Sequence, residues 1–307
     1  MLRTNTPHIF RVATANVGLG RSISETICFI ETLFEQVANN KKGRADVLVL
    51  PELCIPGYEE ELIVKSCQSD IQNALCRIQD SCKRFGIGCV LGIPNLQNEQ
   101  KTYNSAALID RYGRIIGYQD KMQLVPADIS WGNWEYGRMC NVFHMEGIPV
   151  GVMICHDKRF PEISRLMVLG GARILFYISC EQWHDDKSLL TEREPRWTNA
   201  RLLEEIGVYR AQIQARAVEN NVWIIKSNVA RGGSHGHSCI VNPVGRIVSE
   251  AGFEEEFLVS EIDISESSAL YATKSFLKEY RMSDWWKEGV EQYVKVHPPL
   301  PPPRKIK

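Results

Sequence analysis

The sequence contains no hydrophobic run that approaches a membrane span, no excess of one charge and no block of like charges. Its 307 residues include 36 Lys and Arg against 37 Asp and Glu, which gives a formal net charge of −1. A nearly neutral chain has no general electrostatic attraction to nucleic acid. We therefore expect neither a nucleic acid nor a membrane as partner. The length suffices for one large α/β domain or two small ones.

Paired cysteines are also missing, although the chain has 10 cysteines. They are scattered, and none belongs to a Cys-x-x-Cys motif of the kind that binds metals or exchanges disulfides. Met1 to His8 are mostly polar and show no secretory signal. We interpret the cysteines as reduced thiols and expect a cytoplasmic protein.

The centre of the sequence contains a well-marked strand–turn–helix–strand unit. Ile148 to Ile154 is an apolar run of strand length, which is typical of a strand covered on both faces. Charged residues follow Cys155 at once. A Pro-Glu pair then opens a helix predicted over residues 161–169, because proline and an acid suit the first helical turn, and two glycines end it. Residues 173–179 are predicted to form a second apolar strand.

Cys155 lies at the turn between the first of these strands and the helix. A thiol there is held by a rigid element, and helix amides and nearby cations would favour its thiolate, the nucleophilic form. The alternative is a small core residue, because free cysteine is usually buried. The abrupt change from apolar to charged residues favours a reactive Cys155.

Strands alternate with helices along most of the chain, which then finishes in hairpins. This order is typical of a two-layered sheet with outer helices rather than of a barrel of eight regular units. Apolar runs predict strands at residues 10–17, 46–50, 87–93, 105–109, 114–118, 141–147, 222–227, 238–241, 247–249 and 258–262. Helical periodicity predicts helices within residues 23–37, 62–85 and 202–220. Loops are expected at residues 126–136 and 181–196, the second with a short helix.

No repeat or boundary interrupts residues 1–280, so we expect one domain there. Residues 281–307 are expected to form a short helix and a proline-rich arm. A proline run favours an extended polyproline conformation, which could be a ligand for an aromatic groove. The simpler interpretation is a loose arm, or an arm laid across a neighbouring subunit.

Three reactive side chains lie at or just after predicted strand ends: Glu52, Lys121 and Cys155. Together they suit hydrolysis of a carbon–nitrogen bond. The thiolate attacks a carbonyl or nitrile carbon, while the carboxylate takes the thiol proton, protonates the leaving amine and then activates water. The ammonium stabilises the oxyanion with a backbone amide of the turn. Any one of these residues alone would be weak evidence.

The motifs around these residues resemble those of the nitrilase superfamily, the carbon–nitrogen hydrolases, over most of residues 9–265. Pro51-Glu52 resembles the family's general-base motif, and Asp120-Lys121 resembles its lysine motif. Residues 151–162 closely resemble its nucleophile motif. Further matches follow in the expected order: residues 216–220, Asn228 and residues 238–245.

The resemblance implies an α/β fold of the α-β-β-α sandwich type that pairs into a four-layer dimer, so a homodimer or higher homo-oligomer is expected. It implies Glu52 as base, Lys121 as electrostatic stabiliser and Cys155 as nucleophile, with no metal and no cofactor. The expected reaction is hydrolysis of a non-peptide C–N bond in a small amide or N-carbamoyl compound. It proceeds through a thioester acyl-enzyme and releases ammonia or an amine.

One part of the family pattern is altered. Members usually carry a second glutamate between the lysine and the cysteine, a few residues before a glycine that here resembles Gly137. Ungapped counting places Ser130 where the acid should be, while Glu135 and Asp128 lie close by. Either acid could substitute, or the fourth group is absent. We assign Glu135 to substrate binding, with a plain surface charge as the alternative.

The substrate is less well defined. His156 follows the cysteine where dedicated nitrile-cleaving relatives tend to have tryptophan, so the motif is more similar to amidases and N-carbamoyl amidohydrolases. We place His156 and Arg159 in the substrate-binding set, since an arginine can bind a carboxylate through two hydrogen bonds. Pairing of Arg159 with Glu162 or a loop carbonyl is the simpler alternative. Three tryptophans are candidates for lining the pocket: Trp131, Trp134 and Trp183.

Three other functions compete with hydrolysis. His235, His237 and Cys239 are soft ligands at close spacing, but no second cluster completes a tetrahedral metal site. A glycosidase needs two acids at a defined separation, which nothing in the sequence indicates. A non-catalytic homologue that binds a small molecule or a partner is favoured by the altered fourth position and opposed by the intact base, lysine and cysteine.

Overall fold

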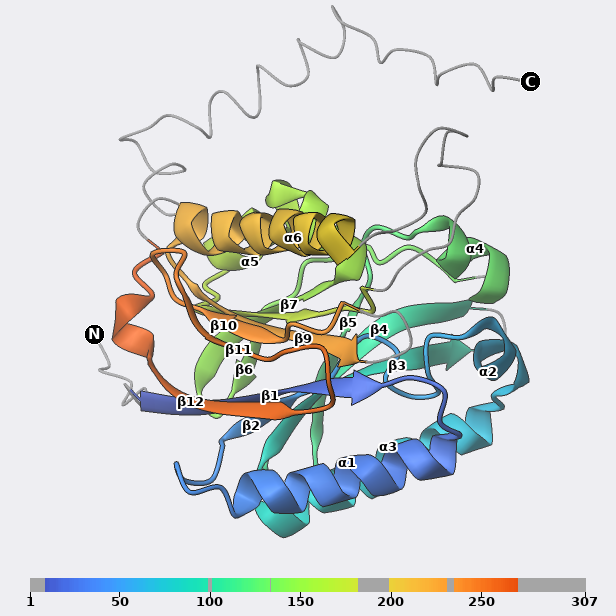
Figure 1. The fold of residues 1–307 in the computed structure, drawn as a ribbon. Helices are drawn as coiled ribbons and strands as arrows, with labels where there is room; N and C mark the ends of the chain where they lie inside the picture. Colours follow the sequence, from blue (N-terminus) through green and yellow to red (C-terminus); the bar gives the residue numbers. More distant parts are fainter. Residues whose placement is uncertain (1–8, 99–100, 133, 182–198, 231–234, 270–307) are drawn as a thin grey trace, which may run out of the picture.

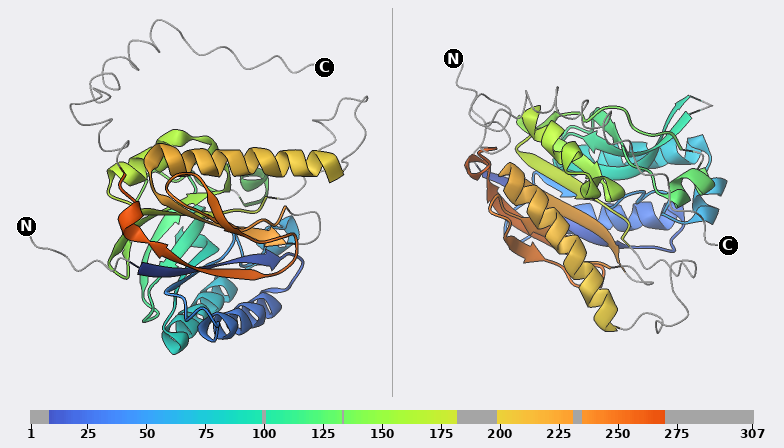
Figure 2. Two further views of the ribbon diagram at one scale, coloured as in Figure 1. Left: turned by 60° about the vertical axis from the view of Figure 1, so that its left-hand side comes forward. Right: turned by 90° about the horizontal axis from the view of Figure 1, so that it is seen from above.

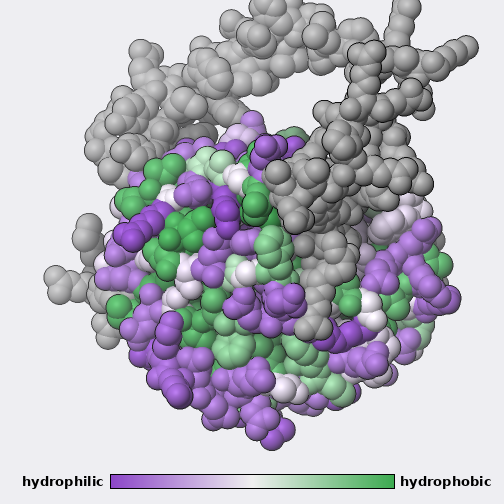
Figure 3. All heavy atoms as spheres, in the orientation of Figure 1, coloured by the Kyte–Doolittle hydropathy of each residue, from purple (hydrophilic) through white to green (hydrophobic). Residues whose placement is uncertain are grey.

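Two half sheets lie face to face between two helical layers, which is the expected α-β-β-α sandwich (Figures 1 and 2). The computed structural model describes residues 9–98, 101–132, 134–181, 199–230 and 235–269. No helix within these ranges is both long and apolar enough to cross a bilayer. On the face seen in Figure 3, hydrophilic residues surround smaller hydrophobic patches. The predicted domain end at residue 280 and the C-terminal arm lie outside the described residues.

The first half sheet is built around parallel strands β1, β2 and β3, with antiparallel strands at both edges. In spatial order its strands are β12 (Phe257–Asp263), β1 (Ile9–Gly18), β2 (Val47–Val49), β3 (Gly88–Asn98), β4 (Lys101–Ile109) and β5 (Ile115–Asp120). Helices α1 (Ile23–Ala38) and α3 (Gln68–Phe85) cover its outer face.

The second half sheet contains the predicted central unit. In spatial order its strands are β6 (Phe143–Met145), β7 (Ile148–Ile154), β8 (Ile174–Ile178), β9 (Trp223–Ala230), β10 (Cys239–Val241) and β11 (Ile247–Glu250). Helices α5 (Pro161–Leu169) and α6 (Asn199–Asn220) cover its outer face. The two halves form one sheet because β1 pairs with β9 at residues 16–18 and 228–230.

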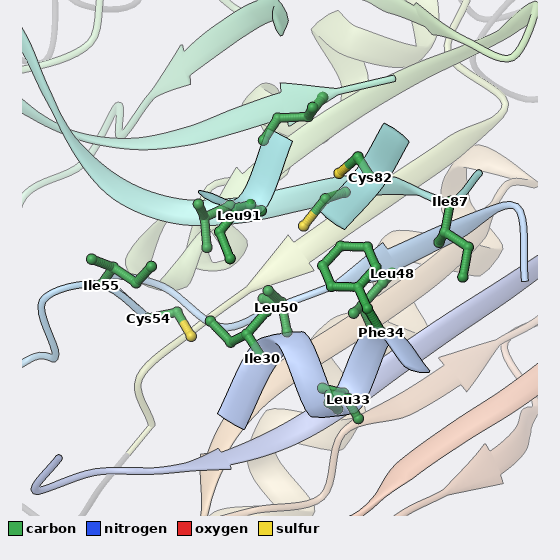
Figure 4. Close-up of a cluster of buried hydrophobic side chains, with 14 of the residues drawn as sticks. Ile30, Leu33, Phe34, Leu48, Leu50, Cys54, Ile55, Cys82, Ile87 and Leu91 are labelled. Atoms are coloured by element: carbon green, nitrogen blue, oxygen red, sulfur yellow. The ribbon is translucent and has the colours of Figure 1, made fainter. Parts of the chain in front are cut away.

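The hydrophobic core has three layers, one under each helical layer and one between the half sheets. Figure 4 shows the first, where Ile30 and Phe34 of α1 pack against Leu48 of β2. Strand β7 contributes to the other two, because Val152 faces the space between the sheets and Met153 faces α5 and α6. The apolar run was therefore correctly predicted to be a strand covered on both faces.

Residues 62–85 and 126–136 differ from the prediction. Residues 62–85 contain parts of two helices, because α2 (Glu60–Lys65) ends before α3 begins. Within the predicted loop at 126–136, residues Pro126–Gly132 form the short helix α4. Proline suits a first helical turn, and Asp128 accepts a hydrogen bond from the Val125 N–H at 2.9 Å. The Trp, Gly and Asp content of this segment concealed the helix.

Replacement of Ile30 by alanine tests the packing between α1 and the first half sheet. Ile30 is fully buried, so the truncated side chain leaves a cavity. We expect the free energy of unfolding to fall by about 2–5 kcal/mol in a urea titration followed by circular dichroism. Ile129→Ala is the matched control, because Ile129 of α4 is 52% exposed. It should change stability by less than about 0.5 kcal/mol; equal losses would contradict this packing.

Candidate active site

The ends of β2 and β5 bring Glu52 and Lys121 into direct contact. Both side chains are buried, and Lys121 Nζ donates to Glu52 Oε1 at 2.7 Å. Asn104 Nδ2 of β4 donates to the same oxygen at 2.7 Å, and the Cys180 backbone N–H after β8 donates to Oε2 at 2.9 Å. Glu52 is thus held from both half sheets.

A second carboxylate contacts Lys121. Asp128 Oδ2 of α4 lies 2.7 Å from Lys121 Nζ, and the Tyr58 hydroxyl donates to Asp128 Oδ1 at 2.7 Å. Burial lowers the pKa of Lys121, but the carboxylates of Glu52 and Asp128 beside it raise that pKa overall. Lys121 is therefore an ammonium ion held between two carboxylates.

Cys155 occupies a strained turn at the end of β7. Its φ of +48° lies in the left-handed region that residues other than glycine rarely adopt. Such backbone strain is typical of functional turns that the surrounding structure holds in place. The residue is partly exposed and begins the 3₁₀ helix η1 (Cys155–Arg159), which was predicted only as a charged segment.

The thiol of Cys155 is protonated at neutral pH. Burial, with the charge of Glu52, raises its pKa to about 12, and Lys121 and Lys158 lower it by less. The prediction that helix amides and cations would favour the thiolate underestimated this burial. A protonated thiol can attack a carbon only after a base removes its proton, and the Glu52 carboxylate lies near enough to act electrostatically on this sulfur.

Asp157 connects the turn that carries Cys155 to the segment after Lys121. Its buried carboxylate accepts hydrogen bonds from the Ile154 N–H at 3.0 Å and from the Gln123 N–H at 2.8 Å. From the other side, Arg216 Nε of α6 donates to the Lys158 carbonyl at 3.0 Å. These bonds fix the turn that carries Cys155 relative to the end of β5.

The structure brings Asp128, and not Glu135, into contact with the lysine. Glu135 is half-buried, and its backbone N–H donates to the Thr102 carbonyl at 2.9 Å. Within the described ranges its carboxylate forms no hydrogen bond or ion pair with Lys121. Ser130 is exposed, and its hydroxyl donates to a carbonyl of α4. Substrate binding by Glu135 stays a prediction.

The two other predicted substrate-binding residues lie on η1. His156 is half-buried, and its ring lies edge-on to that of Phe160 with 5.5 Å between the ring centroids. Burial, together with nearby cations, lowers the pKa of its imidazole. Arg159 is exposed. In the described part of the chain it forms no ion pair with Glu162, the partner of the simpler interpretation. A substrate role for His156 and Arg159 is untested by this geometry.

Two of the three tryptophans pack beside the site. Trp131 contacts Tyr58 at a ring distance of 5.7 Å, and Trp134 is buried in the same cluster. Trp183 lies outside the described residues. Of the histidines considered as metal ligands, His237 contacts Arg210 and Glu250 through Nδ1. No three metal-ligating side chains converge among the residues that the structure describes.

Several buried polar residues near Cys155 were not predicted. Besides Asn104 and Tyr58, these are a triad of charges formed by Lys158 of η1, Glu181 after β8 and Lys226 of β9. Lys226 gave a recognisable signal, because it is the one charged residue in an apolar strand sequence, Val-Trp-Ile-Ile-Lys-Ser. The ion pairs that Glu181 forms with Lys158 and Lys226 gave no signal in the sequence, because the three residues are distant along the chain.

Solved structures identify the fold. The carbon-nitrogen hydrolase from Helicobacter pylori G27 matches at a TM-score of 0.76 and 20% identity, covering 91% of this chain and 98% of that one. A variant of the amidase from Nesterenkonia sp. AN1 matches at a TM-score of 0.71 and 20% identity, covering 93% and 99%. The chain thus has the fold of the nitrilase superfamily.

Sequence comparison identifies the family. The carbon-nitrogen hydrolase model matches residues 11–272, so the chain belongs to the carbon–nitrogen hydrolase family. The 2-oxoglutaramate amidase of Bacillus subtilis is 30% identical over 230 residues, or 73% of this chain and 80% of that protein. The omega-amidase of Danio rerio is 25% identical over 267 residues, or 83% and 88%. The chain is an enzyme for carbon–nitrogen bonds other than peptide bonds.

The raised pKa of Cys155 predicts an unusual pH profile for its alkylation in the free enzyme. Since only the thiolate reacts and its pKa is about 12, the rate with iodoacetamide should rise about tenfold per pH unit between about pH 7 and 9. Peptide mass mapping follows the Cys155 peptide, with an unstructured cysteine-containing peptide, whose thiol has an ordinary pKa near 8.5, as reference. A plateau below about pH 8 would show a stabilised thiolate and contradict this description.

Proposed function

We propose that the chain is a cysteine-dependent amidase that hydrolyses a small amide, or the related N-carbamoyl compound, through a thioester. The observation that carries this proposal is the buried Lys121 ammonium, paired with Glu52 and electrostatically coupled to the protonated Cys155 thiol. A neutral nucleophile, a carboxylate base and a fixed cation are the groups that acyl transfer requires.

In the acylation step, Cys155 Sγ forms a bond to the carbonyl carbon of the substrate while Glu52 takes the thiol proton. Negative charge develops on the carbonyl oxygen, where the Lys121 ammonium and a backbone N–H of the η1 turn stabilise it. The intermediate collapses to a thioester when the C–N bond breaks. Glu52 returns its proton to the departing nitrogen, which leaves as ammonia or an amine.

In the deacylation step, water attacks the thioester carbon. Glu52 accepts a proton from the water, the C–S bond breaks, and the sulfur recovers a proton from Glu52. The carboxylate begins and ends the cycle ionised, which suits a residue held by Lys121, Asn104 and the Cys180 backbone N–H. One base therefore serves both half-reactions, as in other covalent mechanisms.

The comparisons favour an amide over a nitrile. The curated relatives include a 2-oxoglutaramate amidase and omega-amidases, and an amidase with the same fold carries the acetamide moiety of fluoroacetamide on its active site cysteine. His156 in place of the tryptophan of nitrile-cleaving relatives agrees with this choice. Hydrolysis of N-carbamoyl compounds remains the second option within the same mechanism.

Assembly and location remain predictions. The expected homodimer would pair two sandwiches through their helices. Helices α5 and α6 expose apolar side chains that such a contact would cover: Leu166, Leu203, Val208 and Val218. The expected cytoplasmic location agrees with the interpretation of the scattered cysteines as reduced thiols.

Trapping of the acyl-enzyme tests the mechanism. Enzyme quenched in acid during turnover of a primary amide should carry an acyl mass on the Cys155 peptide. Cys155→Ala should lose the adduct and at least about 10⁴-fold of the rate of ammonia release. Cys67→Ala is the matched control, since Cys67 is exposed on the surface and should leave both unchanged. Turnover that survives in Cys155→Ala would refute the proposal.

The two candidate acids of the fourth position are separated by matched variants. Asp128→Asn removes a charge that lies 2.7 Å from Lys121 Nζ, and we expect kcat to fall about tenfold to a hundredfold because the ammonium loses its orientation. Glu135→Gln should leave kcat within about twofold of the wild type, since its carboxylate does not contact Lys121, whereas a substrate-binding role of Glu135 would appear as a raised KM. Steady-state ammonia release measures both. A larger loss of kcat in Glu135→Gln than in Asp128→Asn would assign the fourth position to Glu135.

A further inference from the structure

Three buried charges lie behind the nucleophile turn, apart from the Glu52–Lys121–Asp128 group. Lys158 Nζ lies 2.5 Å from Glu181 Oε1, and Lys226 Nζ lies 2.6 Å from Glu181 Oε2. All three side chains are buried, and they come from η1, from the end of β8 and from β9. We call them the Lys–Glu–Lys triad.

The triad is connected to Cys155 through the backbone and through Tyr177 of β8. Lys158 belongs to the same η1 turn as Cys155 and donates to Tyr177 Oη at 2.9 Å. Tyr177 Oη lies 2.7 Å from Glu181 Oε1 and 3.3 Å from the Cys155 carbonyl oxygen, so its hydroxyl can donate to either. The ring of Tyr209 lies 3.7 Å from Lys158 Nζ and covers it from the side of α6.

The triad and the catalytic group have opposite excess charges. Two lysines and one glutamate leave one positive charge, whereas two carboxylates and Lys121 leave one negative charge. Burial lowers the local screening, so these charges act on a neighbouring ionisable group more strongly than surface charges do. Burying three charges is also costly, and a hydrophobic replacement would hold the strands together as well. Stability alone therefore does not account for the triad.

We propose that the Lys–Glu–Lys triad positions the Cys155 turn and sets the charge behind the nucleophile, so that Glu181 and Lys226 determine how readily Cys155 loses its proton. This inference rests on the proposed role of Cys155. It makes Glu181 and Lys226 positioning residues that act through the turn and through their charge, without contact with the substrate.

The electrostatics of the site agree with this role. Burial raises the pKa of Glu181, but Lys158 and Lys226 lower it overall, so the carboxylate is ionised. Lys158 lowers the pKa of Cys155 and Glu181 raises it. The titratable groups that face Cys155 come from both half sheets: Glu52, Tyr58, Lys121, Lys158, Tyr177, Cys180 and Glu181.

Charge-changing variants test the triad without any substrate. Glu181→Gln removes a negative charge from the triad, so the pKa of Cys155 should fall by about one unit. Lys226→Met removes a positive charge, so the pKa of Cys155 should rise by about one unit. At pH 8 such a shift changes the thiolate fraction about tenfold and, after the opposing change in nucleophilicity, the alkylation rate about threefold. We expect iodoacetamide to alkylate Cys155 faster in Glu181→Gln and more slowly in Lys226→Met.

The double variant Glu181→Gln/Lys226→Met provides the decisive comparison. It keeps the single positive charge of the wild type on Lys158, so its alkylation rate should return to the wild-type value. In the double variant only Lys158 is a buried lysine without its partner, whereas Glu181→Gln leaves both Lys158 and Lys226 without theirs. We therefore expect the double variant to fold more readily than Glu181→Gln. If that single variant fails to fold, Lys226→Met and the double variant still decide the matter. Glu250→Gln, which breaks the half-buried Arg210–Glu250 pair, is the control and should leave the rate unchanged.

Two results would overturn the inference. One is a change of the same sign in both single variants, which is what a purely structural role produces. The other is a double variant that remains as slow as Lys226→Met. Wild-type Cys155 that resists alkylation over the whole pH range would instead refute the proposed function, so the two failures are distinguishable.

Discussion

The arrangement of this site depends on the buried Lys121 ammonium ion, which must be paired with negative charge. Lys121 has no access to water, and an unpaired ammonium in that position would cost several kcal/mol. Its partners, Glu52 and Asp128, come from the end of β2 and from α4. The two ion pairs therefore hold the end of β2 and helix α4 against Lys121 at the end of β5. The same contact places the Glu52 carboxylate near enough to Cys155 to raise the pKa of its thiol.

The Cys155 thiol lies on a strained turn and is kept neutral by burial. A left-handed residue at the end of β7 costs of order 1–3 kcal/mol, which the hydrogen bonds of Asp157 and Arg216 offset by holding the turn. The neutral thiol avoids a third buried anion beside Glu52 and Asp128. In the proposed mechanism, proton transfer to Glu52 is then coupled to substrate binding, when a carbonyl carbon is available for attack and Lys121 faces the new negative charge.

Much of this arrangement could be predicted from local sequence. The apolar run of β7, the cysteine at its end and the Pro-Glu helix start gave the central unit, and charged residues after two other strands gave Glu52 and Lys121. The contact of Asp128 with Lys121 could not be predicted, because α4 is short and its composition is that of a loop. The Lys–Glu–Lys triad was missed because ion pairing between residues 158, 181 and 226 is a property of the folded sheet. The pKa of Cys155 was misjudged because burial, and not the nearby cations, dominates it.

The central claim is that Cys155, Lys121 and Glu52 converge on one substrate carbon. A crystal structure of Cys155→Ala soaked with a primary amide tests it most directly. The amide oxygen should lie about 3 Å from Lys121 Nζ, with the amide nitrogen facing Glu52 and the carbonyl carbon above the missing sulfur. An amide bound away from these groups, or Glu52 and Lys121 found apart, would contradict it.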